Sequence, residues 1–460
     1  MTAAAKNPDP NVRQPGNGSL LVIFLTVFID LLGFGMMLPL LPLYAKRFGV
    51  SEHGWEIGAL MSCFSLMQFI FAPLWGRLSD RIGRRPVLIV GLAGSVVFYA
   101  LCGLATQWQS LIGLFIARIG AGISGATIST AQAYIADTTT PQTRARGMAL
   151  IGVAFGLGFT FGPLLAFTAL SFSQVSPISV GRSAAPSPVE GTVEKVEATA
   201  DAAAENAAAT SPWPGFVAAG LSAIALALAI FRLPESFKPG APAMHVGLFD
   251  SRSLRDALAT PTIAALLITS FISVVSFGGY ETTIAMLLED KQRGFGVKFH
   301  HVPLFFAFIG ITLSLVQGGL VRRLSGKLPE LTLIAVGCTL TVLGFVLLTI
   351  SSLSGMFPLV MIASAVEVAG FAFMAPTLQS LISRRSDPEK QGGILGVSQG
   401  VSALARIVGP LMAVPLFKSV SPVSPYFASI GLMLIGMMVL FLGARGGRDY
   451  GAAATEGIGH

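Results

Sequence analysis

The sequence predicts an all-α membrane protein with twelve transmembrane helices, arranged in two pseudo-symmetric six-helix bundles. Two observations favour this fold class. Of the 460 residues, 53% are hydrophobic and only 12% are charged, whereas about a quarter are charged in soluble domains. A soluble fold of this composition could not cover its apolar surface. In addition, apolar stretches of about 20 residues, each long enough to cross about 30 Å of hydrocarbon, recur along the whole chain.

The predicted spans fall into two groups of six, with each boundary placed to within about four residues. The first group is 20–45, 56–75, 86–106, 109–136, 146–171 and 214–233, and the second is 262–288, 302–321, 330–352, 355–382, 393–417 and 424–443. The predicted domains are a disordered cytoplasmic tail (1–19), an N-terminal bundle (20–233) with an external insertion (173–212), a cytoplasmic linker (234–261), a C-terminal bundle (262–443) and a second cytoplasmic tail (444–460).

Two of these segments interrupt the pattern of spans. The insertion 173–212 is rich in Ala, Ser, Pro and Glu, and such a segment cannot bury enough apolar surface to fold, so we expect a disordered external loop. The linker contains Leu248, Phe249, Asp250 and Leu254. It is either a short interfacial helix or a simple connection between the bundles.

Basic residues predict the orientation in the membrane. When both termini are placed in the cytoplasm, about twenty Lys and Arg residues lie inside and about eight lie outside. We therefore expect a multi-pass protein of the cell (inner) membrane with both termini cytoplasmic. The net charge of +7 is then mainly a topological signal, and no nucleic-acid partner is expected.

A polar segment between the second and third spans carries the clearest motif. It runs Gly76-Arg77-Leu78-Ser79-Asp80-Arg81-Ile82-Gly83-Arg84-Arg85-Pro86, and it resembles the signature loop between helices two and three of the major facilitator superfamily of transporters. The resemblance implies a conformational switch made by Gly76, Asp80, Arg81, Gly83, Arg84 and Arg85. We expect Asp80 to dock on the positive N-terminus of the helix that begins near Gly392 and Gly393 in the other half.

Further motifs resemble the drug and proton antiporter branch of this superfamily, which includes tetracycline and multidrug efflux proteins. Asp30 is followed by Pro39-x-x-Pro42, and Arg118 opens a glycine-rich stretch whose fourth position is Ala121 instead of the usual glutamine. The fifth span contains Gly158, Gly162 and Pro163, which together with the pair Gly278 and Gly279 are candidate hinges.

The two halves of the chain are related. A shift of about 243 residues places the glycines and the proline of the polar motif onto a degraded second copy. The aligned residues are Gly76, Gly83, Arg84 and Pro86 with Gly319, Gly326, Lys327 and Pro329. Such repeats place a substrate site between the halves near the middle of the bilayer.

Five ionisable residues within the spans are candidates for proton coupling: Asp30, Arg118, Glu281, Glu367 and Arg406. A charge at the middle of a bilayer costs at least about 2.5 kcal/mol. Depth along the helices allows Asp30 to meet Arg118 and Glu367 to meet Arg406. Either these are structural ion pairs, or a carboxylate exchanges a proton for substrate. Asp30 is the expected principal carrier, tuned by Arg118, and Glu367 is the alternative.

The expected function is secondary active transport by alternating access, as proton-coupled efflux of amphipathic small molecules or drugs by a monomer in the lipid bilayer. The alternative is a proton-coupled importer of a sugar, organic acid or other metabolite, and a non-transporting sensor or scaffold is a remote third. The sequence contains no nucleotide-binding loop, metal spacing or nucleophile constellation, so no enzyme, cofactor or metal site is expected.

Overall fold

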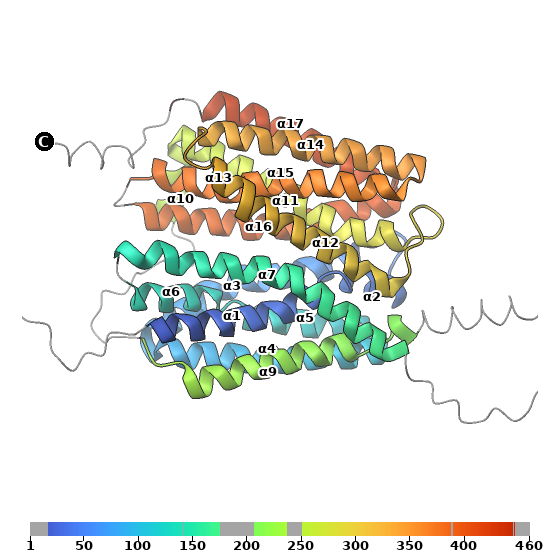
Figure 1. Ribbon diagram of the computed structural model, residues 1–460, viewed down its shortest axis with the longest axis horizontal. Coiled ribbons are helices and arrows are strands. Elements are labelled where there is room, and N and C mark those ends of the chain that lie inside the picture. The colour runs from blue at the N-terminus through green and yellow to red at the C-terminus, as the bar shows by residue number, and fades with distance from the viewer. Residues whose placement is uncertain are drawn as a thin grey trace, which may run out of the picture.

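The computed structural model describes residues 17–139, 141–174, 207–236, 251–387, 390–444 and 446. Twelve helices in these ranges are long and apolar enough to cross a membrane. No strand is found in the described ranges, where Ser325 and Leu328 form an isolated bridge. The all-α membrane fold is thereby confirmed. Helices from the first half of the chain lie together along one side of Figure 1, and those from the second half lie along the other side.

The first half contains six membrane-crossing segments. They are α1 (Asn17–Met37) continued by α2 (Leu41–Arg47), α3 (Trp55–Ile82), α4 (Arg84–Gln107), α5 (Leu111–Gly125) continued by α6 (Ile128–Thr138), α7 (Pro141–Gln174) and α9 (Trp213–Arg232). The interruption between α1 and α2 has a local cause. Pro39 cannot donate a helical hydrogen bond, so α1 ends before it and α2 starts afresh.

The second half begins with a short helix and continues with six spans. They are α10 (Ser251–Ala259), α11 (Pro261–Glu289), η1 (Phe299–His301) with α12 (Val302–Leu315), η2 (Val316–Val321) and α13 (Arg322–Leu324), α14 (Glu330–Ser354), α15 (Phe357–Arg385), α16 (Gln391–Ser419) and α17 (Ser424–Gly443). Below, the helix ends predicted to face the cytoplasm are called the inner end, and the opposite ends the outer end.

The inserted segments are only partly described. Most of the insertion, 175–206, lies outside the described residues, as do Leu248, Phe249 and Asp250 of the linker. The described end of the insertion packs on the first half, where the Tyr44 hydroxyl donates a hydrogen bond to the Ser211 carbonyl (3.4 Å). In the linker, Leu254 lies in α10, so the short helix is present.

The polar motif is not an extended loop. Helix α3 continues to Ile82 and α4 begins at Arg84, so Gly83 alone separates them. Gly83 has φ of 102°, a value that a side chain would strongly disfavour. The expectation of a loop was wrong because a helix can carry polar residues past the edge of the apolar region, and one glycine suffices to reverse the chain.

Glycines fix the closest helix contacts. A Cβ added to Gly158 would lie 3.0 Å from the Leu31 carbonyl oxygen, and one added to Gly162 would lie 2.7 Å from the Gly35 carbonyl carbon. Helices α1 and α7 therefore touch backbone to backbone, as small residues allow. The pair Gly278 and Gly279 does not break α11, which is continuous. Gly279 instead admits Ala413 of α16, whose Cβ would be 3.0 Å from a Cβ at this position.

Contacts between the halves extend from the outer end to the middle of the helices. Ser62 of α3 donates a hydrogen bond to the Ile407 carbonyl of α16 (2.7 Å), and a Cβ at Gly58 would lie 2.8 Å from the Pro410 carbonyl oxygen. Helices α7 and α12 meet where Gly310 faces the Phe159 carbonyl oxygen, 2.5 Å from the position of an added Cβ. Toward the inner end, Gly392 would have no neighbour within 4 Å of such a Cβ.

Candidate functional site

Glu281 of α11 lies between the two halves of the molecule. It interacts electrostatically with Arg406 of α16 and with Arg118 of α5. Neither arginine comes within 4 Å of its carboxylate in the part of the chain that the structure describes. One acid therefore lies near a cation from each half without being locked to either.

Arg406 is accessible although it lies on an interhelical face. Its side chain is exposed, while the next residue, Ile407, accepts the hydrogen bond from Ser62 of the other half. The same turn of α16 carries Gly409, where an added Cβ would lie 2.7 Å from the Val275 carbonyl oxygen of α11. The exposed guanidinium thus lies beside the contact between the halves.

Arg118 is the most enclosed cation of the site. It is 3% exposed, and its guanidinium carbon lies 4.4 Å from the centroid of the Phe64 ring and 5.9 Å from that of Phe34. Its Nε and Nη1 atoms have no hydrogen-bond partner. Cation–π contacts recover about 2 kcal/mol when desolvated, which is less than the cost of burying an unpaired guanidinium. Arg118 is therefore poised to accept an anionic partner.

Asp30 does not pair with Arg118, so the predicted meeting of these residues is wrong for this conformation. The Ser222 hydroxyl of α9 donates to Asp30 Oδ1 (2.9 Å), and Ser95 of α4 lies near the same carboxylate. The depth estimate ignored which way the side chain turns. Asp30 turns toward α4 and α9, while Phe34, one helical turn later, faces Arg118.

Glu367 does not pair with Arg406 either. Its side chain is completely buried, and both carboxylate oxygens lack a hydrogen-bond partner. It faces α14, where a Cβ added to Gly344 would lie 2.6 Å from the Glu367 Cα atom. A bare carboxylate in such a place would be very costly, so the neutral acid is the expected form. Arg406 interacts with Glu281 instead.

Replacing Glu367 with glutamine tests whether Glu367 is a neutral acid enclosed within the second half. Glutamine has nearly the shape of the neutral acid, so the free energy of unfolding is expected to change by less than about 1 kcal/mol. Affinities for matched cationic and neutral ligands should stay in the same ratio, because Glu367 is enclosed within the second half. Thermal unfolding and ligand titration of the purified variant measure both quantities. A selective loss of cation binding would instead place Glu367 at the substrate.

The switch residues at the inner end form a cluster within the first half. Asp80 forms an ion pair with Arg84, whose Nε also donates to Asp137 Oδ2 (3.0 Å). The Glu235 carboxylate accepts hydrogen bonds from the backbone N–H groups of Arg84 (2.9 Å) and Arg85 (3.2 Å) and so caps α4. The predicted docking of Asp80 on the start of α16 is not formed in this conformation. Glu235 follows α9 as a single acid, so no pattern in the sequence pointed to its role.

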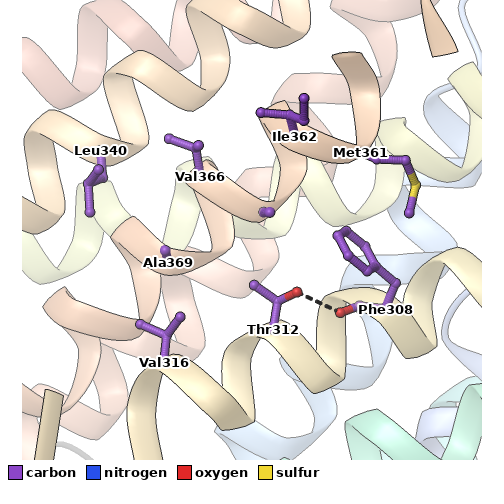
Figure 2. A pocket seen from close by; sticks show the side chains of 9 residues that line it. Phe308, Thr312, Val316, Leu340, Met361, Ile362, Val366 and Ala369 are labelled. Atoms are coloured by element: carbon purple, nitrogen blue, oxygen red, sulfur yellow. Dashed lines mark hydrogen bonds between the residues drawn. The ribbon is translucent and has the colours of Figure 1, made fainter. Parts of the chain in front are cut away.

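A separate apolar pocket lies between α12, α14 and α15 (Figure 2). Its volume is about 540 Å³, and Phe308, Leu340, Met361 and Val366 are among its lining residues. Its polar side chain, Thr312, donates its hydroxyl proton to the Phe308 carbonyl (2.9 Å). Because no charged residue lines this pocket, a charged substrate would find no opposite charge in it, and Glu281 with its two arginines remains the candidate site.

These features define a membrane transporter, and comparison with known proteins shows which family it represents. The family model described as Major Facilitator Superfamily matches residues 23–410. The chain belongs to this superfamily, as the motifs predicted, and is a multi-pass membrane protein.

Its relatives include tetracycline resistance proteins and an organic anion transporter. The class C tetracycline resistance protein of Escherichia coli is 30% identical, with 88% of this chain and 90% of that protein covered. Major facilitator superfamily domain-containing protein 10 of Bos taurus is 29% identical, covering 94% and 95%. The crystal structure of the human organic anion transporter MFSD10 superposes with a TM-score of 0.63 at 26% identity, covering 93% of this chain and 99% of that one.

Proposed function

We propose that the protein exports amphipathic small molecules in exchange for protons, by alternating access, and that Glu281 is the principal proton carrier. The observation that supports this proposal is that Glu281 interacts electrostatically with both Arg118 and Arg406, one cation from each half. The proposal revises the expectation for Asp30, which turns away from this interface toward Ser222. Similarity to the tetracycline resistance proteins supports the outward direction.

The exchange follows from electrostatics at Glu281. An ionised Glu281 binds a polar or cationic group of the substrate and is attracted to both arginines. A protonated Glu281 loses both interactions, so substrate and proton compete. Apolar parts of the substrate would contact rings such as Phe34 and Phe64. We further propose that the protein is a monomer in the inner membrane. Both termini are proposed to lie in the cytoplasm, as the distribution of basic residues predicts.

Transport by reconstituted vesicles tests the export proposal. Tetracycline serves as the probe, and an imposed pH gradient supplies the driving force. Movement of tetracycline against its gradient is expected, with a counterflow of protons that a protonophore removes. Transport at the same rate with and without the pH gradient would reject proton exchange. A panel of cationic, neutral and anionic amphiphiles extends the test. If none of them stimulates proton flux, the transporter proposal as a whole is rejected.

A second candidate is the joint import of an organic anion and a proton. The unpartnered N–H groups of buried Arg118 favour it, as does the similarity to an organic anion transporter. An anion held by Arg118 and Arg406 is repelled by ionised Glu281, so protonation of Glu281 would strengthen binding instead of weakening it. Affinities of 1-naphthoate and its neutral amide, measured between pH 5.5 and about 8, distinguish the candidates by the sign of the pH effect.

A further inference from the structure

An ionic contact joins the two halves at the outer end. Lys46 and Arg47 end α2 in the first half, and Glu289 ends α11 in the second half. Lys46 Nζ lies 2.7 Å from Glu289 Oε2, and Arg47 Nη2 lies 3.0 Å from Glu289 Oε1. Both carboxylate oxygens are thus engaged by cations of the opposite half. In Figure 1, α2 lies at the same end of the molecule as the loop that follows α11.

The surroundings of this contact favour strong pairing. The Glu289 side chain is 10% exposed, and Lys46 and Arg47 are 27% and 24% exposed. Partial exclusion of water strengthens charge-assisted hydrogen bonds and reduces screening by salt. The Arg47 guanidinium also lies 5.2 Å from the centroid of the Phe299 ring in the second half. The pair is therefore a packed contact and not a loose surface bridge.

A second acid lies next to Glu289. Asp290 Oδ2 is 3.8 Å from Lys46 Nζ. Partial burial favours the protonated form of Asp290, but hydrogen bonds from the backbone N–H groups of Arg293 (3.0 Å) and Gln292 (2.9 Å), together with Lys46, hold its pKa below the usual value. Asp290 is consequently ionised at neutral pH, and two acids face two cations across the boundary between the halves.

We propose that Lys46, Arg47, Glu289 and Asp290 form an outer ionic latch, which holds the transporter closed on the outside and sets the balance between its two conformations. Opening the outer end requires α2 and α11 to separate, and this breaks both Glu289 bonds at once. Helix α11 is continuous, so the latch is rigidly connected to Glu281, eight residues or about two turns earlier in the helix. The latch is thus placed to couple the state of the central site to the outer opening.

The latch can be tested by distance measurement between spin labels. Glu52 in the first half and Val420 in the second half are exposed residues at the outer end, and the neighbouring His53 Nδ1 and Ser419 Oγ are 2.9 Å apart. Labels at positions 52 and 420, in a background with the three native cysteines replaced, are expected to give mainly a short distance. Glu289→Gln is expected to raise the ratio of long to short distances about tenfold.

Two further variants complete the test. Glu330→Gln removes a comparable acid that pairs with Arg384 inside the second half, and it should leave the distances unchanged. Reversing the charges with Lys46→Glu, Arg47→Glu and Glu289→Arg should restore the short distance when Asp290→Asn is added. This fourth change removes the acid that would repel the new acid at position 46, and it keeps the oxygen that accepts the backbone hydrogen bonds of Gln292 and Arg293. An unchanged distribution in Glu289→Gln, or an equal change in Glu330→Gln, would overturn the latch. The inference rests on the alternating access proposed above, but the measurement uses neither substrate nor proton gradient, so its failure is distinguishable from failure of the proposed transport.

Discussion

Replacing Glu281 with glutamine is expected to reduce proton-driven transport to the rate of protein-free vesicles. Glutamine keeps the size and hydrogen-bonding capacity of the acid but can neither gain nor lose the proton. Exchange of labelled for unlabelled substrate across the membrane should survive, because that process needs movement of the halves but no net proton transfer. Uptake assays in proteoliposomes, with and without a pH gradient, measure both activities on one preparation.

The matched control for this variant is Asp30→Asn. Asparagine still accepts the hydrogen bond that the Ser222 hydroxyl donates to Oδ1 of Asp30. If Glu281 is the principal carrier, Asp30→Asn retains measurable uphill transport while Glu281→Gln has none. The reverse order would return the principal role to Asp30, as the motif resemblance implies. Equal and complete loss in both variants would show that both acids are needed in the proton pathway.

Replacing Arg118 with methionine is expected to stabilise the protein while it abolishes function. The guanidinium is buried without a partner for Nε and Nη1, so an apolar side chain of similar length removes a desolvation cost and should raise the free energy of unfolding by about 1–3 kcal/mol. Transport should be lost because Glu281 no longer interacts with a cation of the first half. Thermal unfolding and vesicle transport give the two readouts.

A truncation separates charge from packing at the same place. Arg118→Ala also removes the charge but leaves a cavity between Phe34 and Phe64, so it should be less stable than Arg118→Met. Since Asp30 is not the partner of Arg118 in the structure, neither change removes a partner from Asp30. Lower stability in the methionine variant than in the native protein would show that Arg118 has a strong structural partner in the membrane.

The fold could be predicted from the sequence because the membrane leaves few alternatives. Each apolar stretch must form a helix that satisfies its own backbone, so observed spans such as Trp213–Arg232 and Ser424–Gly443 are close to the predicted 214–233 and 424–443. Boundaries moved where polar residues continue a helix beyond the apolar region. The extension of α3 to Ile82 is the clearest example.

The candidate site could be predicted only as a set of residues. Composition and depth identified Glu281, Arg118 and Arg406, but depth contains no information about the direction of a side chain around its helix. The partners of Asp30 and Glu367 therefore differ from those expected. Contacts between distant segments, such as Glu289 with Lys46 or Glu235 with the start of α4, depend on how helices far apart in the sequence pack together, which no local pattern encodes.

The glycine contact between α1 and α7 makes these two helices a single rigid unit. A methyl group at Gly35 would lie 2.4 Å from the Gly158 carbonyl oxygen, so the two backbones have no room to slide independently. Any rocking of the first half must carry α2 and its latch residues together with α7. The approach of Gly310 to the Phe159 carbonyl oxygen, 2.5 Å from an added Cβ, is almost as close and ties α7 to α12 of the other half in the same way. Thr160 and Ser314, whose hydroxyl oxygens are 3.3 Å apart, add a polar contact between α7 and α12 at the same place, so that α12 of the second half is tied to the joined pair α1 and α7.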